Sequence, residues 1–140
     1  MSCWIYKNKC LESAPKEEFG YIYIITNLLD GKIYVGKKQF LHSTKTKISK
    51  KVIKTSGTRK RVIRGTRDSG WLNYFGSSKA LSADIKLIGI DNFSREILCF
   101  CRNKSELTYM ELYWQIQKDV LFIPSYNGWI SGKVFKSKLI

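Results

Sequence analysis

The sequence has no long apolar run and no recognisable export signal. No uninterrupted apolar stretch approaches the roughly 20 residues that a membrane-spanning helix requires. The first residues mix polar and aromatic side chains with lysine, so they lack the apolar core of a secretory signal. We therefore expect no membrane partner and a cytoplasmic location.

Cysteine and histidine patterns that bind metals are also missing. The four cysteines are Cys3, Cys10, Cys99 and Cys101, and no pair has the Cys-x2-Cys spacing of a structural zinc site. His42 is the only histidine, and we assign it to the surface. In a cytoplasmic protein we expect the four thiols to be reduced.

Acidic residues are scarce and unevenly distributed. The chain has 25 Lys and Arg against 11 Asp and Glu, a formal net charge of +14 in 140 residues. Residues 45–67 contain ten of the cations and no acid, whereas the other 15 cations nearly balance the 11 acids. Such a local excess of positive charge indicates a polyanionic partner, which means nucleic acid once a membrane is set aside.

The basic segment shows no sustained apolar periodicity, so it predicts a long loop or flexible insertion over about residues 43–69. We interpret it as an arm that contacts phosphates, which would position the protein without reading base sequence. The alternative is a solvated run of charge. The candidate nucleic-acid-binding residues are Lys45, Lys47, Lys50, Lys51, Lys54, Arg59, Lys60, Arg61 and Arg64.

Regular structure is predicted on both sides of the basic segment. Aromatic and β-branched residues flank an Asp-Gly turn and predict a β-hairpin. Further along, apolar residues at helical spacing alternate with a strand pattern, and Asn103 with Glu106 predicts the start of the last helix. The predicted elements are strands over 21–26, 32–36 and 93–100, and helices over about 78–88 and 103–118.

These elements predict an α/β fold. We expect a small, mainly antiparallel three-stranded sheet flanked by helices, with the basic insertion after the first β-hairpin. A chain of 140 residues fits a single domain, with a core over about residues 20–132. The first 19 residues and those after 118 show no clear periodicity.

Two triplets in the predicted hairpin resemble the signature of a known family. Tyr21-Ile22-Tyr23 and Tyr34-Val35-Gly36 are similar to the two motifs of the GIY-YIG nuclease superfamily, with Tyr21 in place of the usual glycine. Over residues 20–132 the chain resembles the free-standing, Seg-like homing endonucleases of phages, which would place it in a bacterial host cell. The further motifs that carry this resemblance are Trp71-x-x-Tyr74-Phe-Gly-Ser-Ser, Asn92-Phe93, Glu111 and Tyr126-Asn127.

The resemblance implies a metal-dependent endonuclease that hydrolyses phosphodiester bonds in DNA. Glu111 is then the ligand of one divalent cation, Mg²⁺ or Mn²⁺, which stabilises the leaving oxygen, while a tyrosine aids the attacking water. Because a free tyrosine has a pKa of about 10, it needs help from a nearby cation, which is the role assigned to Lys37. The catalytic residues carried over are Tyr23, Tyr34, Lys37, Tyr74 and Asn127.

One residue of the family pattern is missing. The family has an arginine four residues before a His or Tyr on the helix after the hairpin, and with Tyr74 as that aromatic residue the position is Gly70. Arg67 lies one turn earlier and would reach the same place if residues 67–75 were helical. We therefore assign Arg67 to the catalytic set, with Arg59, Arg61 or Arg64 of the basic segment as alternatives.

Two other functions remain open from the sequence. A catalytically degenerate module that binds DNA or RNA would explain the basic charge and the missing arginine. A structural or RNA-associated basic protein would explain the charge without any metal dependence. The nuclease is the favoured interpretation, with double-stranded DNA as its partner and a monomer as its expected state.

Overall fold

The computed structural model describes residues 3–47, 62–130 and 136. Two helices and seven strands are described there, with two short 3-10 turns. The strands are β1 (Trp4–Tyr6), β2 (Lys9–Leu11), β3 (Gly20–Asn27), β4 (Ile33–Gln39), β5 (Leu41–Lys47), β6 (Val62–Asp68) and β7 (Phe93–Cys101). The helices are α2 (Lys79–Ile88) and α3 (Lys104–Gln117), and the 3-10 turns are η1 (Trp71–Asn73) and η2 (Ile90–Asn92).

The main sheet has five strands in the order β2-β1-β7-β3-β4. Strands β3, β4 and β7 form the predicted antiparallel core, but β1 pairs in parallel with β7, so the sheet is mixed and the prediction of three strands is wrong. The added pair is a hairpin whose turn residues, Lys7 and Asn8, both have positive φ, as a tight two-residue turn requires. Three-residue strands are too short for a periodic signal, and β7, which links this hairpin to the sheet through β1, is distant in the sequence.

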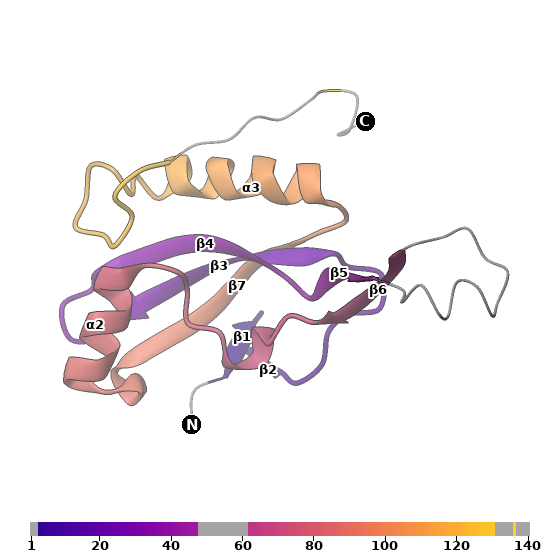
Figure 1. The fold of residues 1–140 in the computed structure, drawn as a ribbon. Coiled ribbons are helices and arrows are strands. Elements are labelled where there is room, and N and C mark those ends of the chain that lie inside the picture. Colours follow the sequence, from indigo (N-terminus) through magenta and orange to yellow (C-terminus); the bar gives the residue numbers. More distant parts are fainter. Residues whose placement is uncertain (1–2, 48–61, 131–135, 137–140) are drawn as a thin grey trace, which may run out of the picture.

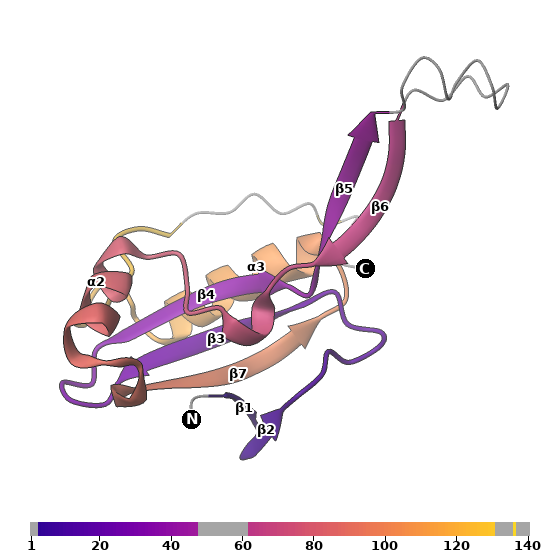
Figure 2. The same cartoon turned by 60° about the horizontal axis from the view of Figure 1, so that its bottom comes forward.

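The predicted basic loop is a β-hairpin where the structure describes it. Strands β5 and β6 pair in register from Leu41 with Asp68 to Lys47 with Val62, and they form a separate two-stranded sheet. Figure 2 shows this hairpin projecting beyond the end of the main sheet. The prediction of a loop is therefore wrong over these strands, whose mixture of threonine with lysine hides a β pattern from an apolar count. The cations that lie outside the described residues are Lys50, Lys51, Lys54, Arg59, Lys60 and Arg61.

Both predicted helices are confirmed with their caps. The Ser78 hydroxyl accepts a hydrogen bond from the Leu81 N–H at the start of α2, and Gly89 ends this helix. The Asn103 side chain accepts from the Glu106 N–H at the start of α3. A cap of this kind stabilises a helix by about 1 kcal/mol, which explains why these boundaries could be read locally.

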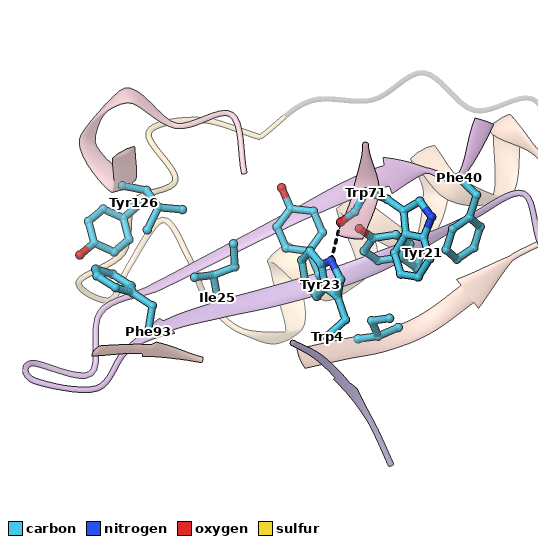
Figure 3. Close-up of a cluster of buried hydrophobic side chains, with 10 residues drawn as sticks. Trp4, Tyr21, Tyr23, Ile25, Phe40, Trp71, Phe93 and Tyr126 are labelled. Carbon is cyan, nitrogen blue, oxygen red and sulfur yellow. Dashed lines mark hydrogen bonds between the residues drawn. The ribbon is translucent and has the colours of Figure 1, made fainter. Parts of the chain in front are cut away.

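The two helices cover opposite faces of the main sheet (Figure 1). On the α2 face, an aromatic cluster surrounds Trp4, whose indole N–H donates to the Trp71 carbonyl at 2.6 Å (Figure 3). On the α3 face, a second cluster contains Ile22 and Val35 with Leu107 of the helix. The sheet therefore separates two cores, and each side of β4 faces a different helix.

The cysteines differ from the expectation. A disulfide joins Cys3 to Cys10 across the β1–β2 hairpin, whereas Cys99 and Cys101 are free thiols. The expectation of four reduced thiols is wrong for Cys3 and Cys10. It followed from the expected cytoplasmic location, whereas a hairpin brings these two cysteines close together. None of the helices in the described part of the chain is long and apolar enough to cross a membrane.

Candidate active site

The register of the β3–β4 hairpin decides where the signature tyrosines point. Tyr23 pairs with Gly36, and Tyr34 pairs with Ile25. Side chains at directly paired positions share a face, and so do those two residues apart on one strand. Tyr23 and Tyr34 therefore lie on the same face of the sheet, the one covered by α2, with ring centroids 6.1 Å apart.

Glycine is required at two points for this arrangement. A Cβ at Gly36 would collide with the Tyr23 hydroxyl, so the absence of a side chain lets the Tyr23 ring lie across β4. Gly76 has a φ of +85°, and a Cβ there would lie 3.1 Å from the Tyr34 ring and from Leu81. These close approaches explain why glycine suits the last position of the second triplet and the turn before α2.

A cavity of about 570 Å³ curves around the outer edge of β4. β4 is the last strand of the sheet, so side chains from both faces of the sheet can line a cavity at its outer edge. Tyr34 contributes from the α2 face, while Lys37 and Glu111 contribute from the α3 face. The remaining lining residues are Tyr23, Ser77, Ser78, Lys79, Gln115, Tyr126, Asn127, Gly128, Trp129 and Ile130.

Tyr34 lines this cavity from the α2 face of the sheet. Its hydroxyl lies 3.1 Å from the Ser77 hydroxyl, which belongs to the turn before α2. Burial raises the pKa of Tyr34 above its ordinary value of 10, although the contact with Ser77 acts in the opposite direction. The residue is therefore a neutral phenol near pH 7 in the site as described.

Glu111 projects from the middle of α3 into the same cavity. Its side chain is 18% exposed, and its carboxylate lies 3.9 Å from the Lys37 ammonium. Burial raises the pKa of Glu111 above its ordinary value, while the positive charge of Lys37 lowers it. Lys37 also donates to the Thr108 hydroxyl at 3.3 Å, so this lysine serves the glutamate side of the site rather than a tyrosine.

Asn127 holds the edge of β4 in place. Its side-chain oxygen accepts from the Val35 N–H, and its side-chain N–H donates to the Val35 carbonyl, both at 2.9 Å. The amide thus replaces a neighbouring strand between the two signature residues Tyr34 and Gly36. Asn127 is a positioning residue, because both ends of its side chain are used by the backbone of β4.

The other tyrosines predicted for the site have different surroundings. Tyr23 is 1% exposed, and burial raises its pKa well above 10. Tyr74 packs edge-on against Tyr23 at 5.9 Å, and the Lys38 ammonium lies over its ring at 4.1 Å. Tyr74 is absent from the residues that line the cavity.

The structure does not bring Arg67 to the cavity. Arg67 is an exposed residue of β6, paired with His42, and the only helical turn in residues 67–75 is the short η1. The required helix is missing because Gly70 has a left-handed backbone and the Asp68 side chain accepts from its N–H. The assignment of Arg67 depended on that helix and has no support in the structure.

Three further candidate residues were missed by the sequence analysis. Lys79 lines the cavity at the first position of α2, where a positive charge is unfavourable next to the positive end of the helix dipole. That misplaced charge was a signal that could have found it. Gln115 was detectable as well, because it lies one turn after Glu111 on α3.

The third missed residue is Arg95, which is 3% exposed on β7. Its guanidinium lies between the rings of Trp4 and Phe75 and donates to the carbonyls of Leu72 and Tyr74 at 2.9 and 2.8 Å. It therefore fixes the backbone that leads into the Gly76 turn. Arg95 falls between Phe93 and Ile97 in the alternating pattern of β7, so a charged residue occupies an inward-facing position. That departure from the pattern was the signal in the sequence.

The donor set fits a single hard divalent cation. In residues 3–47 and 62–130 there is no cluster of three or more His, Cys, Asp or Glu. Mg²⁺ often uses one or two carboxylates with water and substrate phosphates. Glu111 supplies a carboxylate, and the buried Gln115 Oε1 has no hydrogen-bond partner among the described residues.

Comparisons with known proteins identify a family for this chain. Residues 4–130 match the family described as "Putative endonuclease segE, GIY-YIG domain". The chain is 29% identical over 112 residues to the "Putative endonuclease segD" of Enterobacteria phage T4. That match covers 80% of this chain and 38% of the relative, so the chain spans little more than a third of its length. No solved structure matches the chain significantly.

Proposed function

Because the chain belongs to the GIY-YIG nucleases of the SegE type, we propose that it is a divalent-metal-dependent endonuclease that hydrolyses double-stranded DNA. The observation that carries the proposal is the cavity around the edge of β4, where Tyr34, Lys37 and Glu111 meet. A homing-like role in a bacterial host is part of the proposal and rests on the resemblance to the Seg proteins.

Tyr34 is the residue that activates water in this proposal. In its phenolate form, after its own proton has passed to solvent, Tyr34 takes a proton from the attacking water as the new P–O bond forms, and the P–O bond to the leaving ester oxygen breaks. The leaving oxygen is protonated by solvent. The Ser77 hydroxyl, 3.1 Å from Tyr34, orients the phenol within the cavity.

Glu111 and Gln115 would hold the cation, with Lys37 restraining the carboxylate. When bound, a divalent cation supplies positive charge for the phosphate and for the developing charge on the leaving oxygen. The positive charge of Lys37 lowers the pKa of Glu111 and so opposes the effect of burial, which raises the pKa of this carboxyl. Asn127 fixes the β4 backbone between the two halves of the site.

Lys79 supplies the phosphate-binding cation that the sequence pattern lacks at Gly70. It enters the cavity from α2, whereas Lys37 and Glu111 enter from the other side of β4. Among the described residues, its ammonium has no ion-pair partner. A phosphate in the cavity would satisfy Lys79 and would lie beside Tyr34. The basic β5–β6 hairpin would then contact more distant phosphates of the duplex.

Plasmid cleavage tests the proposed function directly. We expect the purified protein to convert supercoiled plasmid into nicked or linear DNA with Mg²⁺ and to leave it intact with excess EDTA, and readdition of Mg²⁺ should restore cleavage. Gel electrophoresis over time measures both conversions. Cleavage that is unchanged in EDTA would contradict the metal dependence. Tight binding without cleavage in Mg²⁺ or Mn²⁺ would favour a degenerate binding module.

Replacing Lys79 with alanine should slow cleavage by about 10²-fold, because one well-placed charged donor is worth that much in a transition state. Lys79→Arg should retain most of the rate. Single-turnover cleavage gives the rate, and urea unfolding should show no loss of stability because the lysine opposes the helix dipole. The matched control is Lys86→Ala in the last turn of the same helix, outside the cavity. Equal rates for the two alanine variants would contradict the assignment.

A further inference from the structure

One wall of the active-site cavity carries an exposed aromatic side chain. Trp129 is 72% exposed and lines the cavity together with Tyr34, Lys37 and Lys79. Tryptophan has a large apolar surface, so leaving it in water is unfavourable unless a partner covers it in the working complex. The cavity therefore joins cations that suit a phosphate to an aromatic ring that suits a flat apolar group.

Trp129 is held in position from both sides along the chain. Before it, Asn127 is fixed to Val35 by two hydrogen bonds, and the Tyr126 hydroxyl donates to Asp84 at 2.7 Å. After it, Ile130 packs against the hydrophobic cluster on the α3 face. The indole is thus presented from an anchored backbone, which lowers the entropy that a binding partner would have to remove.

We propose that Trp129 stacks on a nucleobase that has left the helix next to the scissile phosphate. A base in a paired stack has both faces covered, so only an unpaired or displaced base offers a face to the indole. Aromatic stacking beside a positively charged groove is the general means by which proteins hold single-stranded nucleic acid. The inference rests on the proposed function for the position of the scissile phosphate, and it assigns locally distorted or unpaired DNA as the preferred substrate.

Binding to two matched DNA probes tests this assignment. The probes are a fluorescein-labelled duplex and the same duplex with a three-nucleotide gap, titrated with the full chain in EDTA so that no cleavage occurs. We expect the gapped probe to bind about tenfold more tightly, and Trp129→Ala to remove that preference, since loss of one base stack has an effect of this size. The affinity for the intact duplex should fall much less than the affinity for the gapped probe.

Three further variants separate stacking from apolar contact and from folding. Trp129→Phe should keep most of the preference, whereas Trp129→Leu should lose it. Phe122→Ala is the matched control, because Phe122 is 90% exposed but lies outside the cavity lining, and it should behave like the unmodified protein. A preference that survives in the alanine and leucine variants, or no preference in the unmodified protein, would overturn the proposal.

The outcome is distinguishable from failure of the proposed function. If the protein nicks plasmid in Mg²⁺ but replacing Trp129 changes binding to neither probe, the stacking proposal is contradicted and the endonuclease proposal stands. If the preference for gapped DNA depends on Trp129 but no nicking occurs, the stacking proposal stands and the endonuclease proposal is contradicted.

Discussion

Replacing Glu111 with glutamine is expected to slow DNA cleavage by about 10³-fold while DNA binding persists, because the variant lacks the negative charge that a divalent cation needs. Single-turnover cleavage in Mg²⁺ and binding titrations in EDTA measure the two effects separately. Glu106→Gln is the matched control, since Glu106 is on the same helix but pairs with Arg102 away from the cavity. Loss of cleavage in both variants, or in neither, would contradict the assignment.

The stability of the same variant provides a second readout. Burial raises the pKa of Glu111 in the folded protein, so the native state holds this proton more tightly than the unfolded chain does. The contribution of this group to stability is therefore present below its unfolded pKa of about 4.5 and is lost as pH rises through the folded pKa. At pH 7 the ionised carboxylate weakens the fold, so Glu111→Gln should show an unfolding midpoint in urea equal to or above that of the unmodified protein. A clear loss of stability would indicate a structural role instead.

Replacing Tyr34 with phenylalanine is expected to lower the cleavage rate by about 10³-fold, within the range of a lost acid or base group. The ring remains packed between Gly76 and Tyr23, so the fold should be retained. Tyr113→Phe is the control, because Tyr113 is exposed on α3 and outside the cavity. A rate for Tyr34→Phe within a few-fold of the control would remove Tyr34 from the reaction.

The pH dependence identifies the role of Tyr34. Burial raises its pKa above 10, so the phenolate is a small fraction near neutral pH, and that fraction grows about tenfold per pH unit. If the phenolate accepts the proton of water, the logarithm of the rate should rise with pH across the neutral and mildly alkaline range. The slope should disappear in Tyr34→Phe. An identical slope in Tyr34→Phe would mean that the pH dependence of the rate comes from another titratable group.

The signature hairpin and the two helices were readable from the sequence because their causes are local. A strand, a tight turn and a capped helix each depend on residues within a few positions of one another, as at Ser78 with Leu81 or Asn103 with Glu106. The same holds for the candidate residues Tyr34, Lys37 and Glu111, whose order along the chain carries the family pattern. The structure places these three in one cavity, as that pattern implies.

What the tertiary structure decided depends on contacts between distant segments. The pairing of β1 with β7 joins residues about 90 positions apart, and no local pattern encodes a partner at that distance. The failure of Arg67 and the appearance of Lys79 have the same origin, because the turn at Gly70 redirects the chain before α2 begins. The placement of Trp129 beside the cations likewise follows from the bonds between Asn127 and Val35, 92 positions apart. The sequence by itself determined the order of the candidates Tyr34, Lys37 and Glu111, whereas the packing around the outer edge of β4 decided which side chains line one cavity, because Asn127 and segments from both faces of the sheet meet at that edge.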